Sequence, residues 1–209
     1  PRSTPKPSSA ASDVYKRQMY AVGACIAQRA FERKKTPSEV CLKKWQFSCW
    51  NGKKLKDLQF THVLMIPDSE SRLLFEVLEK ETSIELITPC REGESIAIAA
   101  GLWTGGSNPL IVIQNTGLME AGDSLRGCGI GPRVPFRMMI GWRGYGGAMS
   151  NKLPIDSAYT YTEPLLNGWG IPFWHLMKDD DLEVMDKMNK TAEETSMPAA
   201  VITGYTFKE

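Results

Sequence analysis

The hydrophobic pattern becomes regular from about residue 55, where short apolar runs begin to alternate with longer segments of helical character. Continuously apolar strands that alternate with helices are typical of a parallel sheet covered on both faces. The pattern therefore predicts an α/β fold: a single doubly wound, mainly parallel sheet with helices on both faces. The runs that predict strands are 62–66, 84–88, 110–114, 136–141, 172–177 and 199–203.

Between these runs, apolar residues recur at helical spacing. Ser69 is the expected cap of the first helix, and Pro164 is expected to interrupt the fourth. The second predicted helix consists almost entirely of small and aliphatic residues and ends before Gly105 and Gly106. The predicted helices are 70–80, 92–103, 117–126, 157–169 and 180–195.

The first 54 residues lack this regularity. Residues 1–18, PRSTPKPSSAASDVYKRQ, match the in-frame translation of a transposase-based sequencing adapter, so we expect an artefact of an assembled metagenomic fragment, disordered in the chain. A disordered basic tail is the alternative. Residues 19–54 are rich in Lys, Arg and Cys and carry no functional expectation, although 21–33 has some helical character. The domain prediction is therefore 1–18 adapter, 19–54 uncertain and 55–209 one folded domain.

The charge, the lengths of the apolar runs and the cysteine pattern make several classes of function unexpected for this chain. The net charge is +1, and residues 1–18 contribute four basic residues and one acidic residue, so the remainder carries 1 − 3 = −2. This balance gives no reason to expect nucleic acid or an anionic membrane as a partner. No apolar run approaches the roughly 20 residues of a membrane span. Five cysteines without a CxxC pair predict neither a zinc site nor a disulfide framework, and with no signal peptide we expect a cytoplasmic protein.

Three loops carry the candidate chemistry, because the carboxyl ends of parallel strands meet at one edge of a sheet, where ligands bind. Glu92 follows one predicted strand and begins a helix, and partial burial there would suit it to proton exchange. The turn 114–118 follows the next strand, and Arg143 lies in a glycine-rich loop where it can hold a carboxylate or sulfonate. Taken singly, each has a plainer reading: an acidic residue favoured by the helix dipole, a turn, and a solvated arginine.

Together, the segments REGESIAIAAG (91–101), QNTGL (114–118) and GWRG (141–144) resemble the pyrimidine-binding (PYR) domain of thiamine-diphosphate (ThDP) dependent 2-oxoacid decarboxylases. The resemblance is to the sulfopyruvate decarboxylase alpha subunit and phosphonopyruvate decarboxylase family, over about residues 55–205. It implies a carboxy-lyase subunit in which Glu92 hydrogen-bonds a ring nitrogen of the aminopyrimidine and so activates the thiazolium carbon. It also implies that the cofactor binds at a turn made by Asn115, Thr116, Gly117 and Leu118. The candidates for binding an anionic 2-oxoacid, such as sulfopyruvate or phosphonopyruvate, are Arg91 and Arg143.

The chain departs from that family at two places near the expected substrate end. Trp142 stands where a histidine is frequent, and Met119 and Glu120 follow the QNTGL turn in place of Gly-Asn. Glu120 would repel a second anionic group if it pointed inward. The Gly-Asp-Gly run of a diphosphate-binding domain has no counterpart here, so the resemblance implies that a separate beta subunit holds Mg²⁺ and shares the active site in a hetero-oligomer. No metal site is expected on this chain.

Two other readings remain open. The alternative is a non-catalytic α/β binding or regulatory protein that retains the PYR fold. A third is a stand-alone hydrolase that uses Cys90 or Ser95, although the sequence contains no GxSxG motif and no evident base. His62 and His175 are expected to be structural, and the glycine-rich run 127–131 lacks the spacing of a dinucleotide-binding motif.

Overall fold

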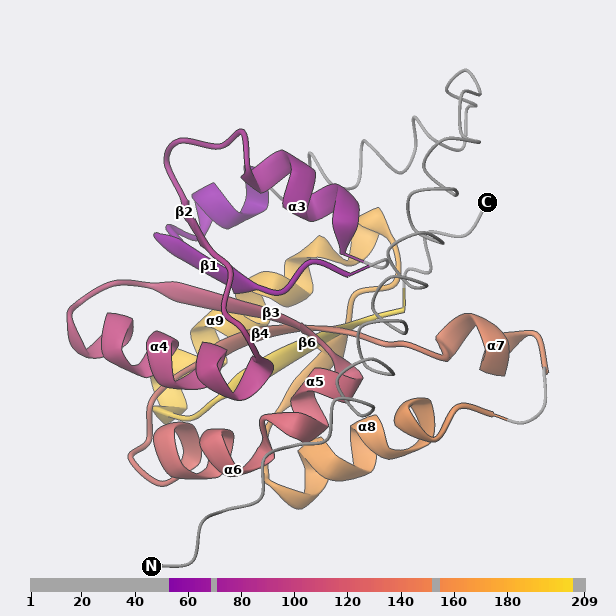
Figure 1. Cartoon of the computed structure of the whole chain (residues 1–209). Coiled ribbons are helices and arrows are strands. Elements are labelled where there is room, and N and C mark those ends of the chain that lie inside the picture. The colour runs from indigo at the N-terminus through magenta and orange to yellow at the C-terminus, as the bar shows by residue number, and fades with distance from the viewer. Residues whose placement is uncertain (1–52, 69–70, 152–154, 205–209) are drawn as a thin grey trace, which may run out of the picture. The chain divides into compact units, whose positions relative to one another are not determined.

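The computed structural model describes residues 53–68, 71–151 and 155–204, all of which lie in Leu42–Glu209, the second of the two units of the chain. Six strands form one sheet in the order β2-β1-β3-β4-β6-β5, and every neighbouring pair is parallel (Figure 1). The predicted α/β sheet is confirmed. Its strands are β1 (His62–Met65), β2 (Glu85–Ile87), β3 (Pro109–Gln114), β4 (Arg137–Gly141), β5 (Phe173–His175) and β6 (Ala199–Thr203).

Helices connect the strands, and residues 53–57 form a further helical segment ahead of β1. The named helices are α3 (Arg72–Leu78), α4 (Glu92–Thr104), α5 (Asn115–Glu120), α6 (Gly122–Ser124), the π-helix η1 (Leu125–Ile130), α7 (Tyr145–Met149), α8 (Ser157–Gly168), the 3₁₀-helix η2 (Asp179–Leu182) and α9 (Glu183–Thr195).

Two hydrophobic cores lie on opposite faces of the sheet. Along β3, Leu110 and Val112 join one core, whereas Ile111 and Ile113 join the other, as the alternation of side chains along a strand requires. The first core packs under α3 and α9 and the second under α4, α5, η1 and α8, so helices cover both faces (Figure 1). The predicted doubly wound arrangement is therefore present.

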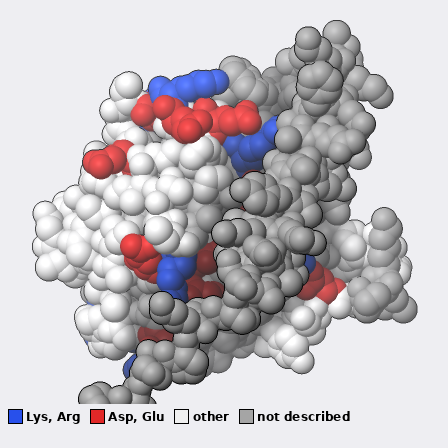
Figure 2. Space-filling view, viewed as in Figure 1, with Lys and Arg blue, Asp and Glu red and all other residues white. Residues whose placement is uncertain are grey.

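Helix α4 differs from the other long helices because apolar residues surround it. Ile96 and Ala99 are fully buried against the sheet, while Ala97 and Gly101 are exposed on the outside and Trp103 is 39% exposed. Figure 2 shows few charged side chains over the length of α4, with charges gathered near its beginning. A helix that is apolar all round is typical of a buried position, so the outer face of α4 has the character of a surface that becomes covered.

The structure corrects three local predictions. Helix α8 runs through Pro164 without interruption, because its side chains Ala158, Thr162 and Leu166 are anchored in the core. The glycine-rich segment expected to be a loop contains the short helix α7. The helix expected at 117–126 begins earlier, at Asn115, and continues as η1 to Ile130.

Some predictions fall outside the described residues. The adapter assignment for 1–18, the helix at 21–33 and most of the uncertain segment 19–54 lie there, as does the expected cap Ser69. Within the described part, Ser71 occupies the N-cap position of α3 without a side-chain cap bond. The Asp68 carboxylate instead accepts from the backbone N–H of Ser71 at 2.7 Å and from its hydroxyl at 2.9 Å.

Candidate functional site

The three loops singled out in the sequence follow β2, β3 and β4 at the carboxyl edge of the sheet. Chain order reverses there: β2 lies on one side of β1 and β3 on the other. Such a switch point is where open α/β sheets bind ligands. Gln114 and Gly141, the last residues of β3 and β4, are register partners, so the second and third loops leave the sheet side by side.

Glu92 lies directly against Gly117. A Cβ atom built at Gly117 would approach Glu92 Cγ to 2.4 Å and its Oε1 to 2.6 Å, which is closer than any side chain can pack. Glu92 is half-buried, and its carboxylate makes no hydrogen bond or ion pair with any described residue. The first and second loops are therefore in contact through a carboxylate whose oxygens have no hydrogen-bond donor within the described part of the chain.

Asn115 joins the second loop to the third. Its side chain is completely buried, and its Nδ2 donates to the backbone carbonyl of Arg143 at 3.1 Å and to Thr162 Oγ1 at 3.1 Å. Its Oδ1 is buried without a partner among the described residues. Buried polar atoms without partners are rare, and this one lies in the turn that follows β3.

Two further residues of the predicted cofactor turn, Thr116 and Leu118, lie in different environments. The half-buried Thr116 donates its hydroxyl to Gln114 Oε1 at 2.8 Å. Leu118 is fully buried and belongs to the core beneath α4 and α8. Thr116 thus lies at the rim of the turn, whereas Leu118 anchors α5 to the sheet.

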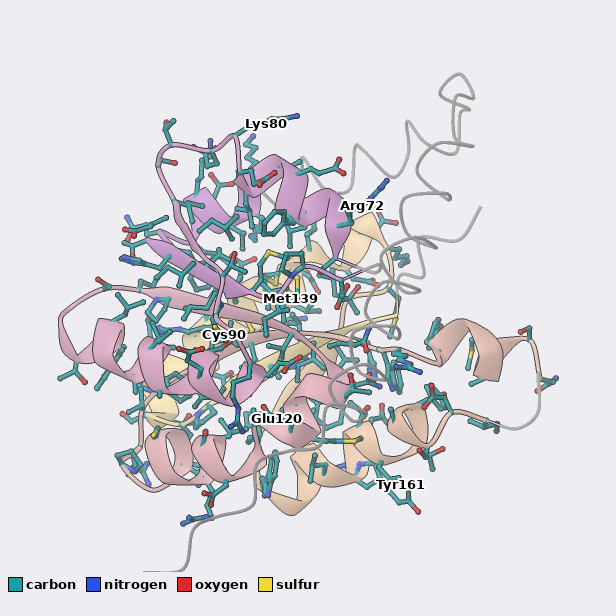
Figure 3. All side chains as sticks on the ribbon, viewed as in Figure 1. Arg72, Lys80, Cys90, Glu120, Met139 and Tyr161 are labelled. Atoms are coloured by element: carbon teal, nitrogen blue, oxygen red, sulfur yellow. The ribbon has the colours of Figure 1, made fainter. Side chains whose placement is uncertain are left out.

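Arg91 is engaged by an acidic residue of α5. Its guanidinium forms an ion pair with Glu120 Oε1, while Glu120 Oε2 accepts from the backbone N–H of Gly93 at 2.8 Å. Figure 3 labels Glu120 between α5 and the beginning of α4. Glu120 therefore points toward the first loop, and its negative charge is matched by an arginine and a helix N-terminus.

Arg143 has a different environment. Its Nε lies 3.2 Å from Asp156 Oδ2, and its two terminal nitrogens make no hydrogen bond with the described residues. Asp156 is the N-cap of α8, because its Oδ1 accepts from the backbone N–H of Ala158 at 2.9 Å. One carboxylate thus caps a helix and holds an arginine by its inner nitrogen, which leaves the planar end of the guanidinium free for an anion.

Trp142, the residue in place of the family histidine, packs inward. It is 8% exposed, its Nε1 donates to the carbonyl of Tyr159 at 3.2 Å, and its ring stacks on the rings of Tyr159 and His175 at centroid distances of 4.7 and 5.3 Å. His175 in turn lies 2.7 Å from Glu163. Trp142 therefore packs in the hydrophobic core next to the third loop and supports that loop.

Three contacts that organise the site were not predicted from the sequence: those made by Asp156 and Thr162, and the pairing of Glu120 with Arg91 and Gly93. Only Asp156 carried a local signal, since an aspartate just before a helix is a capping residue. Among the described residues, no cluster of three or more His, Cys, Asp or Glu side chains is placed to hold a metal ion. None of the described helices has both the length and the apolar character needed to cross a membrane.

Comparison with known proteins supports the resemblance inferred from the sequence. The chain is 25% identical to the sulfopyruvate decarboxylase of Methanosarcina acetivorans over 109 residues, which cover 52% of this chain and 27% of that protein. It is 31% identical over 93 residues to the phosphonopyruvate decarboxylase of Streptomyces viridochromogenes, covering 44% and 23%. It is 27% identical over 120 residues to the sulfopyruvate decarboxylase subunit alpha of Methanothermobacter thermautotrophicus, covering 57% and 71%.

No protein-family model matches the chain. The first two relatives are much longer than the matched part, since the chain spans only about a quarter of each. The third is named as a subunit, which implies that it works with a second chain. In sequence, the chain resembles sulfopyruvate and phosphonopyruvate decarboxylases at 25–31% identity over part of its length.

Proposed function

We propose that this chain is the pyrimidine-binding alpha subunit of a ThDP-dependent 2-oxoacid decarboxylase. The observation that carries the proposal is the Glu92 carboxylate, which begins α4, rests on Gly117 and has no partner among the described residues. A carboxyl group held in this way can share a proton with a ring nitrogen of a bound aminopyrimidine. The similarity to proteins named as decarboxylases supports the same reading.

The residues around Glu92 fit such a ring. Glu92 would hold the proton at its carboxyl oxygen. The Oδ1 of Asn115, which is buried without a partner among the described residues, belongs to the turn that contacts Glu92. Gly117 has no side chain to separate the turn from Glu92. When bound, ThDP supplies the carbon nucleophile and the electron sink that loss of CO₂ requires. Asn115, Thr116 and Gly117 would line its pyrimidine, and Leu118 would hold α5 in place from the core.

A partner subunit completes the proposed site. We propose that Mg²⁺ and the diphosphate are held by a beta subunit with a Gly-Asp-Gly motif, as the resemblance to the alpha subunit of a decarboxylase suggests. The outer face of α4 supports this assembly because it is apolar, and no described residue lies within 4 Å of a Cβ built at Gly101. A second chain packed there would exclude water from the Glu92 end of the helix.

We propose a small anionic 2-oxoacid such as sulfopyruvate or phosphonopyruvate as the substrate. Arg143 is the better placed of the two candidate arginines, because its terminal nitrogens have no partner among the described residues and a capping carboxylate fixes its inner nitrogen. Arg91 is already paired with Glu120, so it can bind an anion only by sharing or exchanging that carboxylate. The proposal therefore gives Arg143 the main contact and Arg91 a secondary one.

The test is CO₂ release from a panel of 2-oxoacids by the chain co-purified with the Gly-Asp-Gly subunit expected from a neighbouring reading frame. Glu92→Gln should lower kcat by at least about 100-fold, the scale of a lost proton-transfer group. Glu94→Gln is the matched control, since Glu94 lies in the same helical turn and, within the described part of the chain, accepts only from the backbone N–H of Cys90. Equal activity of Glu92→Gln and wild type would refute the proposal. ThDP binding without decarboxylation of any panel member would favour the non-catalytic alternative.

A further inference from the structure

Helix α4 begins without a cap of its own. Arg91 occupies its N-cap position, and arginine has no side-chain acceptor to offer. The first backbone N–H groups of a helix lack intrahelical partners, and helix ends fray. Glu92 is the first residue of α4, so its position depends on how this turn is held.

Glu120 supplies the missing acceptor from another helix. Its Oε2 accepts from the backbone N–H of Gly93, the second residue of α4, at 2.8 Å. Its Oε1 pairs with Arg91, the N-cap residue itself. A Cβ atom built at Gly93 would lie 3.4 Å from Glu120 Oε2, which is an ordinary van der Waals distance. Both oxygens of one carboxylate therefore fix the backbone and the N-cap side chain of the same turn.

The same short helix also supplies the surface on which Glu92 rests. Gly117 and Glu120 are three residues apart on α5, so they lie on one face. Gly117 contacts the Glu92 side chain, and Glu120 contacts the residues on either side of Glu92 in the chain. Helix α5 thus holds the first turn of α4 at two points.

We propose that Glu120 is a positioning residue that caps α4 from α5 and so holds the Glu92 carboxylate against Gly117. The inference rests on the proposed function of Glu92. It gives a role to Glu120, which in the sequence is only a departure from the family pattern that would repel a second anionic group if it pointed inward. The neutral acceptor oxygen of a glutamine can serve as the cap, whereas alanine cannot.

The kinetic test compares Glu120→Ala and Glu120→Gln in the complex with the beta subunit, with ThDP and Mg²⁺ present. Glu120→Ala should lower kcat about tenfold through misplacement of Glu92 and leave KM for the 2-oxoacid within about threefold of wild type. Glu120→Gln should recover most of that loss. The control is Asp123→Asn, which removes a neighbouring surface carboxylate that pairs only with Arg126 among the described residues. An unchanged kcat in Glu120→Ala, or equal losses in both variants, would overturn the inference.

A second measurement is independent of activity. In the chain labelled with ¹³C at glutamate carboxyl carbons, the Glu92 resonance is identified by its loss in Glu92→Gln. It should shift in Glu120→Ala and stay at the wild-type position in Glu120→Gln and Asp123→Asn. If the complex shows no decarboxylation but this pattern holds, the proposed function fails while the positioning of Glu92 stands. If the Glu92 resonance is the same in every variant, the inference itself fails.

Discussion

The Glu92 side chain packs on the bare backbone of Gly117, so closely that a Cβ atom there would lie 2.6 Å from Glu92 Oε1. The two residues come from different helices, and their contact defines the centre of the candidate site. This relationship makes the glycine as necessary as the glutamate, because any side chain at 117 must displace the carboxylate.

Gly117→Ala should therefore impair decarboxylation while the fold survives. A displacement of the Glu92 carboxylate by about 1 Å should lower kcat by about 10- to 100-fold. Gly101→Ala is the control, since Gly101 lies on the exposed side of α4 with nothing within 4 Å of a Cβ. Kinetics of the co-purified complex and thermal unfolding of each variant measure the effect. Full activity in Gly117→Ala would show that Glu92 does not work from this position.

Arg143→Lys should separate substrates by charge. A lysine loses the planar pair of terminal donors, so KM for a 2-oxoacid with a second anionic group should rise about tenfold, which corresponds to about 1.4 kcal/mol. The KM for pyruvate should change little. Arg126→Lys, at a surface pair with Asp123, is the control. An equal rise for pyruvate would argue against Arg143 as the contact for the distal anion.

Gly144→Ala should destabilise the third loop. Gly144 has φ of +92°, and its Cβ would lie 2.8 Å from Asp156 Cβ and 2.9 Å from Tyr159 Cβ. The strained backbone and the overlap together should cost about 3 kcal/mol. Gly106→Ala is matched in backbone conformation, with φ of +87° and open space around it, and should cost about 1 kcal/mol. Equal costs in urea unfolding would mean that the loop does not hold this close contact.

Replacing Glu193, the partner of Arg137, should lower the free energy of unfolding more than replacing Arg137 itself. It is 4% exposed, donates to Glu193 and to the carbonyl of Pro135, and burial lowers its pKa while Glu193 opposes that shift. Glu193→Gln leaves a buried cation without an anion and should cost about 2 kcal/mol of unfolding free energy. Adding Arg137→Met should recover part of that loss, because the unpaired charge is then gone. Additive costs in the double variant would contradict this coupling.

Glu81 should contribute to acid sensitivity. A hydrogen bond from Lys56, then those from the backbone N–H and hydroxyl of Ser83, lower its pKa from 4.5 to about 2. A carboxyl whose pKa is lower in the folded state stabilises the fold above its unfolded pKa, and that contribution is lost as the pH falls from 4.5 to about 2. Glu81→Gln should therefore be less stable than wild type at neutral pH and equal to it at the acid end. A difference that is independent of pH would contradict this assignment.

The individual helices and strands could be predicted because each depends mainly on residues close together in the sequence. An apolar run and its flanking turn residues predict a strand such as β3 without knowledge of its neighbours, and the small-residue composition of α4 sets its length up to Gly105. Pro164 shows the limit of such reasoning: its local preference predicts a break, but the buried side chains of α8 keep the helix intact. The short helix α7 likewise depends on contacts that a glycine-rich sequence does not reveal.

The sequence by itself therefore determined the class of fold, the edge of the sheet that carries the candidate site, and the glutamate at the beginning of α4. Only the tertiary structure decided which partner each charged residue takes: Glu120 for Arg91, Asp156 for Arg143, and among the described residues none for the Glu92 carboxylate. These pairings depend on strand order and on how α5 and α8 pack against the sheet. Such contacts join residues far apart in the chain, so no local pattern specifies them.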